Sequence, residues 1–394
     1  MVCTTSKHSK LYRFLYIEAD ENYGTPLDIT ALATAGVGSW KDLKVTTGPS
    51  EIAIEMQETT LANYGPSLRD DHTQFAYWKV TGGSVVTPHH ASFAANHTGL
   101  LGSGFGSYVA GAGSGVLTVA ATDTNQLVLD TGEGATFTAG QMIKIGDRIA
   151  TIDSISTDTL SIDHDISVSV TYEIGTSVTE LDTWNPQCLQ DNKYYHAIIW
   201  DANEYWLLEY FKPSFTMNSN DGGVPMQWTM NLSAYSARRL TAATSDVEDV
   251  VAATALDTYT ISTLNNKTRV FVQASEIQDI SSVTLEIERD NTRWETGVNA
   301  NGAVGSINDI TSTTGSLTVF TNKDTYHDYV ANNTEINIGW QSSDGYFAFN
   351  APAAKLTRSG ENPIGDENNQ NVAMFGISYN EQHDETMKVY LGDL

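Results

Sequence analysis

An internal repeat constrains the fold of this chain more than any other feature of its sequence. Residues 195–235 and 335–379 share one layout: a strand that ends in Trp, a polar turn, an aromatic strand followed by a Pro, a long polar loop and a strand that ends in Tyr. Upstream, IEMQETTLANYG (54–65) resembles LEIERDNTRWETG (285–297). The residues that define the repeat are Trp200, Pro213 and Tyr235 in the first copy and Trp340, Pro352 and Tyr379 in the second.

Similarity within one chain at a nearly constant separation is typical of duplicated structural units. We therefore expect two copies of one domain. The alternative is that two β-hairpins look alike by chance, because alternating aromatic residues are common in sheets.

Alternation of apolar and polar residues predicts that both copies are built from strands. Residues 51–57 read EIAIEMQ and residues 283–288 read VTLEIE, so apolar and polar side chains lie on opposite faces in each segment. Glu55 in one copy, and Glu286 and Glu288 in the other, then lie opposite an apolar face. A solvated sheet face explains each segment alone, but a duplication would present the same acidic surface twice per chain.

Helical patterns are few. Residues 323–331 place Tyr326, Tyr329 and Val330 at helical spacing, and residues 246–256 fit either a helix or a linker. The predicted fold class is mainly β, with duplicated β-sandwich or barrel domains that each carry a short helix.

A segment with a different composition and strand spacing interrupts the first copy. The glycine-rich run 99–115 leads into residues 116–174, which contain five or six short strands joined by turns and no Trp. Regular short strands predict a small inserted β-barrel, and we expect the glycines beside it to form a flexible hinge. The expected domains are 1–112 with 178–240 (first, discontinuous), 113–177 (inserted) and 241–394 (second).

The charge excludes one class of function. The chain has 21 Lys and Arg against 48 Asp and Glu, a formal net charge of −27. Affinity for nucleic acid comes largely from cations that neutralise phosphates, so DNA binding by attraction is excluded. Cys3 and Cys188 are the two cysteines and form neither a disulfide framework nor a zinc motif. We expect no signal peptide and no membrane-spanning segment.

No group of residues forms a persuasive catalytic or metal site. His89, His90 and His97 could bind a transition metal, but polar histidines in a loop are the favoured interpretation. Carboxylate pairs such as Asp163 with Asp165 arise from composition in a chain this acidic. We therefore expect no enzymatic activity, no cofactor and no bound metal.

Residues 291–394 resemble the tail tube (major tail) proteins of long-tailed bacteriophages. The matching segments are NTRWETG, GSLTVFTNKDTYHDYV, INIGW, YFAFNAPAAKLT and NVAMFGISYNEQHDETMKVYL. The segments YIEADENYGTP and GLLGSGFG in the first half are also similar to that family. The resemblance covers the chain apart from residues 113–177.

The resemblance implies a structural virion protein, assembled in the host cytoplasm, whose rings stack into the hollow tail tube. Its partners would be further copies of itself, the tape-measure protein, and tail terminator and baseplate proteins. DNA would pass through without specific binding, and no membrane would be involved. Related rings contain six tube domains, so two domains per chain would give a trimeric, pseudo-hexameric ring. Glu55, Glu286 and Glu288 are then expected to face the lumen, and residues 113–177 the outer surface.

Two other classes remain open. One is another virion component, such as a capsid decoration or baseplate protein. The other is a carbohydrate-binding β-sandwich module, suggested by eight Trp and 18 Tyr residues.

Overall fold

A computed structural model gives the fold of this protein. It describes residues 12–19, 40–47, 53–61, 72–81, 83–90, 92–122, 124–165, 170–186, 193–201, 204–218, 226–240, 250, 254–255, 269–273, 275–277, 280–288, 291–295, 303–308, 312–319, 324–342, 345–361, 371–377 and 387–392. Strands dominate these segments, which confirms the mainly β class. No helix in them is both long and apolar enough to cross a membrane.

The first half of the chain, outside residues 114–180, consists of strands and the helix α2 in its described segments. Its elements are β1 (Tyr12–Glu18), β2 (Lys41–Leu43), β3 (Ala53–Leu61), β4 (His72–Thr81), β5 (Ser84–Pro88), α2 (Phe93–Gly104), β6 (Ser107–Val109), β13 (Thr183–Asn185), β14 (Tyr195–Asp201), β15 (Glu204–Asn218), β16 (Gln227–Ser233) and β17 (Ser236–Leu240).

The second half has a similar succession of elements. They are β18 (Arg269–Val272), β19 (Ser275–Ile277), β20 (Ile280–Glu288), β21 (Asn291–Glu295), β22 (Ala303–Asn308), β23 (Ser312–Val319), α4 (Asp324–Ala331), β24 (Glu335–Gln341), β25 (Ala348–Glu361), β26 (Asn371–Ile377) and β27 (Lys388–Tyr390).

The order of strand pairing occurs twice along the chain. In the first half the pairs run β1–β14–β15–β16–β5, and in the second they run β18–β24–β25–β26–β23. β2 lies beside β1 as β19 lies beside β18, and β17 pairs with β15 as β27 pairs with β25. Each helix packs on the long strand of its half, α2 on β15 and α4 on β25.

Strand β16 shows how the sequence builds the core. In QWTMNLS, Trp228, Met230 and Leu232 are buried while the intervening polar residues are half-buried. Trp228 stacks on Phe93 of α2 at 5.4 Å between ring centroids and meets Phe105 edge-on at 4.9 Å. One cluster of buried side chains continues from these residues into the second half, so the two halves share a core.

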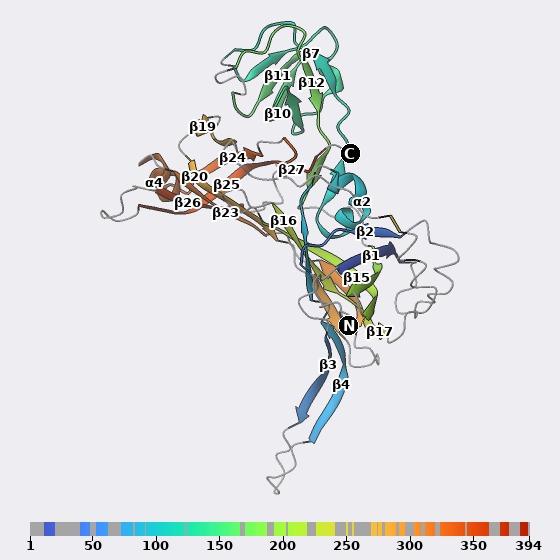
Figure 1. Ribbon diagram of the computed structural model, residues 1–394. Helices are drawn as coiled ribbons and strands as arrows, with labels where there is room; N and C mark the ends of the chain where they lie inside the picture. Colours follow the sequence, from blue (N-terminus) through green and yellow to red (C-terminus); the bar gives the residue numbers. More distant parts are fainter. Residues whose placement is uncertain are drawn as a thin grey trace, which may run out of the picture.

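Residues 114–180 form a separate six-stranded barrel. Its strands are β7 (Ser114–Val116), β8 (Gln126–Val128), β9 (Met142–Ile145), β10 (Arg148–Ser156), β11 (Thr159–Ile162) and β12 (Ser177–Glu180), with the 3-10 helix η1 (Gly134–Thr136). They pair in the order β7-β12-β9-β10-β11-β8, and the bridge Leu117↔Leu129 closes the ring. The barrel has its own core and lies beyond the main sheet at one end of the molecule (Figure 1).

The barrel differs from the expected insert in one strand. At the end of the expected run of short strands, residues 170–174 form no strand, and Tyr172 makes only an isolated bridge to Ala121. The strand that pairs with β7 and β9 is β12, so the barrel extends beyond residue 177.

The sequence predicted one helix correctly and missed another. The helix expected over residues 323–331 is α4. In the candidate segment 246–256, the structure describes Val250, Thr254 and Ala255, and Thr254 donates its amide to the Val250 carbonyl as in a helix. Helix α2 was not expected because it contains three glycines, which have low helix propensity.

Glycine at the end of α2 allows the helix to pack closely on β15. A Cβ at Gly104 would lie 2.7 Å from the carbonyl oxygen of Pro213, which is shorter than a van der Waals contact. Packing of the helix against the long strand therefore outweighs the low intrinsic propensity of its glycines.

Replacing the central core tryptophan tests this packing. Trp228→Ala should lower the free energy of unfolding by about 3–5 kcal/mol, because a fully buried indole leaves a cavity. The matched control is Thr229→Ala on the opposite face of β16, which should change it by less than about 0.5 kcal/mol. Urea unfolding followed by near-ultraviolet circular dichroism measures both. Equal effects of the two substitutions would contradict the assignment of the core face.

Candidate functional site

The two halves are joined by backbone pairing. The last residues of β15 pair with β20 in antiparallel register, Thr216 opposite Glu288, Met217 opposite Ile287 and Asn218 opposite Glu286. This seam makes one continuous sheet in the order β5–β16–β15–β20–β23–β26–β25. The sheet therefore has two long faces that run across both halves.

One face is apolar and belongs to the core. Thr87, Trp228, Met217 and Ile287 are consecutive neighbours across four strands, and all four are fully buried. The opposite face is polar, and we call it the polar face. Its described members include Gln227, Thr229, Asn231, Ser233, Thr216, Glu286 and Thr314.

The sequence-predicted acidic residues lie on two different hairpins. Glu286 is exposed on the polar face, between Asn218 and Thr314 in register. Glu288 ends β20 opposite Thr216 and Ser312. Glu55 lies in β3, opposite Lys79 of β4, on a hairpin that extends away from the rest of the molecule (Figure 1). The structure therefore places Glu286 and Glu288 on one strand of the continuous sheet and Glu55 in a separate two-stranded sheet.

The two described lysines on the polar face each have an interaction partner. Lys212 is almost completely buried, and its ammonium lies 5.9 Å from the centroid of the Tyr194 ring. Lys355 forms an ion pair with Glu335 at 3.4 Å. Among the residues of this face whose side chains the structure describes, Glu286 carries an exposed carboxylate.

The residues that define the sequence repeat occupy partly matching positions. Trp200 lies in β14 opposite Tyr205, as Trp340 lies in β24 opposite Phe349. The prolines differ. Pro213 lies in the regular part of β15, opposite Leu232.

Pro352 instead lies where the register of β25 shifts against β24, a site at which a strand tolerates a missing N–H group. Tyr235 donates its amide to Glu209 and its ring meets Tyr210 edge-on. Tyr379 lies outside the described residues.

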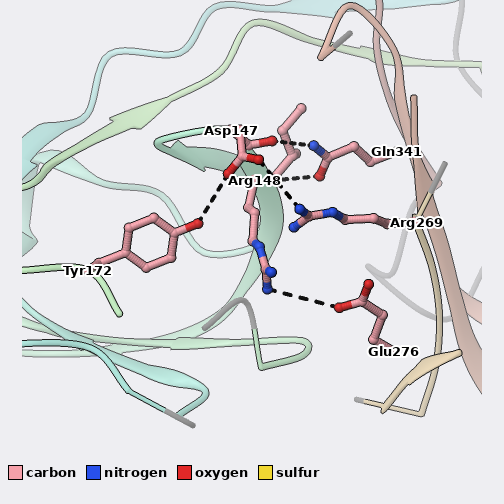
Figure 2. Close-up of polar contacts among 7 residues, drawn as sticks. Asp147, Arg148, Tyr172, Arg269, Glu276 and Gln341 are labelled. Atoms are coloured by element: carbon pink, nitrogen blue, oxygen red, sulfur yellow. Dashed lines mark hydrogen bonds and ion pairs between the residues drawn. The ribbon is translucent and has the colours of Figure 1, made fainter. Parts of the chain in front are cut away.

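The barrel is bonded to the second half of the chain, although it is inserted in the first. Gln341 of β24 accepts a hydrogen bond from the Ile149 amide at 2.9 Å and donates one to the Asp147 carbonyl. Arg148 faces Glu276 at 3.9 Å, and Asp147 faces Arg269 at 3.4 Å (Figure 2). These contacts surround the β9–β10 turn of the barrel, and we call them the barrel junction.

Buried polar groups extend the barrel junction toward β25. Asn350 donates to the Thr151 hydroxyl at 2.6 Å and to the Asp163 carboxylate at 3.2 Å. Asp163 also accepts the Thr151 amide at 2.8 Å. The ring of His164 stacks on Phe271 with centroids 3.6 Å apart. Asp163 is therefore a hydrogen-bond acceptor within the barrel junction.

A tyrosine completes the barrel side of the junction. The hydroxyl of Tyr172 lies 3.5 Å from the Asp147 carboxylate (Figure 2). Burial raises the pKa of Tyr172 to about 12, and the nearby guanidinium of Arg148 opposes this rise. Tyr172 is therefore neutral at physiological pH, and its hydroxyl donates a hydrogen bond to the Asp147 carboxylate.

The linkers to the barrel are held by carboxylates. Glu180 accepts hydrogen bonds from the amides of Ala112, Gly113 and Thr138, and Asp182 accepts the Gly111 amide. The expectation of a flexible hinge in residues 99–115 is wrong, because its first part is helix α2 and its last part is bonded in this way.

The three histidines considered as metal ligands are buried among aromatic side chains. His89 accepts the Trp228 indole N–H at 3.2 Å and lies 3.1 Å from the Tyr346 carbonyl. His97 bonds with the Tyr16 hydroxyl at 2.8 Å, and His90 with Ser92 at 3.2 Å. The interpretation as polar loop residues is wrong. No cluster of three metal-ligating side chains occurs in the part of the chain that the structure describes.

Sequence reasoning missed the barrel junction. Its signal was weak but present, since Gln341 and Asn350 are polar residues at the ends of the apolar runs INIGW and YFAF. Both are buried, and buried amides need partners.

No protein-family model matches this chain, and no curated protein matches it.

Removing the junction amide should release the barrel without unfolding it. Gln341→Ala leaves the buried Ile149 amide and Asp147 carbonyl without their side-chain partner, a cost of about 1–3 kcal/mol for each buried group. Hydrogen exchange at Ile149 should accelerate, while Leu160 in the barrel core keeps its protection. The control Lys355→Ala removes only a partly exposed ion pair and should leave Ile149 unchanged. Unchanged exchange at Ile149 in Gln341→Ala would contradict this role.

Proposed function

We propose that this chain is a tail tube protein of a long-tailed bacteriophage, whose rings stack into a conduit for DNA. The observation that carries the proposal is the continuous sheet made from two halves with the same pairing order. One face of that sheet is core, and the other is polar with an exposed carboxylate at Glu286. A sheet with these properties suits the wall of a channel.

The chemistry of the polar face suits a surface along which DNA slides. Hydroxyl and amide side chains interact with water as readily as with phosphate, and carboxylates repel phosphate. The net charge of −27 adds a repulsive field over the whole molecule. An exposed cationic wall would instead retain the polyanion.

The two halves suggest the composition of a ring. If each half acts as one tube domain, three chains supply six domains and form a trimeric, pseudo-hexameric ring. The partners would be other copies of the chain, the tape-measure protein, and the tail terminator and baseplate proteins. DNA would pass through the bore in the virion tail without specific binding.

The barrel is assigned to the outer surface of this tube. It contacts β24, β25 and the β18–β19 hairpin through the buried groups of the barrel junction, which are not members of the polar face. An outward barrel would add bulk without narrowing the bore.

The buried aromatic residues do not favour a carbohydrate-binding module. Trp184, Trp228 and Trp340 are almost completely buried, whereas sugar-binding platforms expose their rings. Trp206, a further described indole, is half-buried against the main core.

Electron microscopy of the purified chain at high concentration tests the proposal directly. We expect rings or hollow tubes with three chains per ring. Six chains per ring would retain the tube function and reject the assignment of two tube domains per chain. Particles that remain monomeric, together with measurable binding to polysaccharide, would reject the tube function.

Reversing the charge of the three acidic residues expected in the lumen tests the lumen assignment. The triple variant Glu55→Lys, Glu286→Lys, Glu288→Lys should slow DNA ejection from assembled particles, because the new cations attract phosphate. The control Glu173→Lys makes the same kind of charge change on the exposed surface of the barrel and should leave ejection unchanged. Fluorescence of released DNA measures the rate. A normal rate in a triple variant that still forms tubes would refute the lumen assignment.

A further inference from the structure

The two halves of the chain differ in the side chains that turn away from their shared core. In the first half, the neighbouring strands β1, β14 and β15 place Leu15, Ile198 and Leu207 side by side on that outer face. All three are fully buried and pack in one apolar cluster with Val250. This row is an ordinary apolar core layer, covered by another segment of the chain.

The corresponding row of the second half is partly polar. Its strands β18, β24 and β25 place Phe271, Gly339 and Asn350 side by side. The barrel covers this row, and the ring of His164 stacks on Phe271 with 3.6 Å between the centroids. The second half therefore receives the barrel on a row with a buried amide and a glycine, where the first half has aliphatic side chains.

The amide group of Asn350 is oriented by its partners. Its nitrogen donates to the Thr151 hydroxyl and to the Asp163 carboxylate. An ionised carboxylate only accepts hydrogen bonds, so the nitrogen of the amide, and not its oxygen, faces Asp163. The Oδ1 atom of Asn350 is buried and has no hydrogen-bond partner among the described residues.

His164 is a second buried group whose polar atoms lack a partner. It follows Asp163 on the barrel and is 3% exposed. Its Nδ1 lies 2.8 Å from an oxygen of Asp163 but is not aligned for a hydrogen bond, and Nε2 bonds to no atom of the residues that the structure describes. Buried polar atoms normally have a partner, so both side chains indicate a ligand between the barrel and β25.

A small cavity lies between these two side chains. Asp163, His164, Phe271, Gly339 and Asn350 are among the residues that line it. About 10 Å³ of the cavity is open to the centre of a water molecule, which is the room that one such molecule needs. Glycine at position 339 preserves this space, because a Cβ there would lie 3.7 Å from Oδ1 of Asn350.

We propose that this cavity binds one water molecule, which bridges His164 of the barrel and Oδ1 of Asn350 in β25. A water molecule donates to the amide oxygen and can also donate to, or accept from, an imidazole nitrogen. An anion offers no donor to the amide oxygen. The two oxygens of Asp163 already accept protein N–H groups, which disfavours a metal ion beside them.

The site is complete only when the barrel is docked. His164 belongs to the barrel and Asn350 to the second half, so release of the barrel separates the two groups that hold the water. The water thus contributes to the barrel junction, and the inference does not depend on the proposed function.

A high-resolution crystal structure of the full chain tests the site directly. We expect a density peak about 2.7–3.2 Å from both Oδ1 of Asn350 and one ring nitrogen of His164. A peak about 2.0–2.2 Å from the ring nitrogen would identify a metal ion and overturn the proposal. A ring nitrogen bonded directly to a protein atom, with no peak beside Asn350, would overturn it as well.

Nuclear Overhauser measurements test the dependence on docking in solution. In the full chain labelled at histidine, a long-lived bound water should give a cross-peak between water and the carbon-bound ring protons of His164. His164→Phe identifies that cross-peak by its loss. Gln341→Ala, which should release the barrel, should abolish the cross-peak, whereas the control Lys355→Ala should retain it.

The outcomes of this measurement are distinct. Absence of the cross-peak from the unsubstituted chain would overturn the water site. An undiminished cross-peak in Gln341→Ala, when accelerated exchange at Ile149 shows that the barrel has been released, would overturn the bridging role. Loss in Gln341→Ala together with retention in Lys355→Ala supports the proposal.

Discussion

The backbone pairing between β15 and β20 is the constraint on which the rest of the structure depends. It turns two half-sheets into one sheet, aligns their apolar faces into a shared core and leaves their polar residues on the opposite face. Three pairs of residues make this seam, but they fix the register of every strand on either side of it, because a slip by one residue would exchange the two faces. Met217 and Ile287, fully buried at its centre, secure that register.

Much of the strand pattern could be predicted from sequence, because alternation reports directly which side chains are buried. QWTMNLS in β16 and VTLEIE in β20 each separate core from polar residues, and the Tyr spacing in α4 predicted its helix. Helix α2 could not be predicted, since its stability comes from packing of Phe93 and Gly104 against distant strands. Local propensity carries no information about such partners.

The candidate site also combines features that local sequence predicts with contacts between residues that are remote in sequence. The exposure of Glu286 followed from its alternation with Ile287, whereas the barrel junction joins residues remote in sequence, such as Ile149 and Gln341, which are 192 positions apart. The histidines were misplaced for a related reason. His89, His90 and His97 lie in a polar-looking segment, but residues from distant parts of the fold enclose them, among them Tyr16 and Trp228.

The position of the barrel has a consequence for synthesis. During translation the barrel, residues 114–180, is synthesised before the residues to which it attaches, Arg269, Glu276, Gln341 and Asn350. Its closed ring of strands and separate core allow it to fold while those residues are still absent. The barrel can therefore fold first and remain attached through its two hydrogen-bonded linkers. It can dock only after the C-terminal part of the chain has reached its native arrangement.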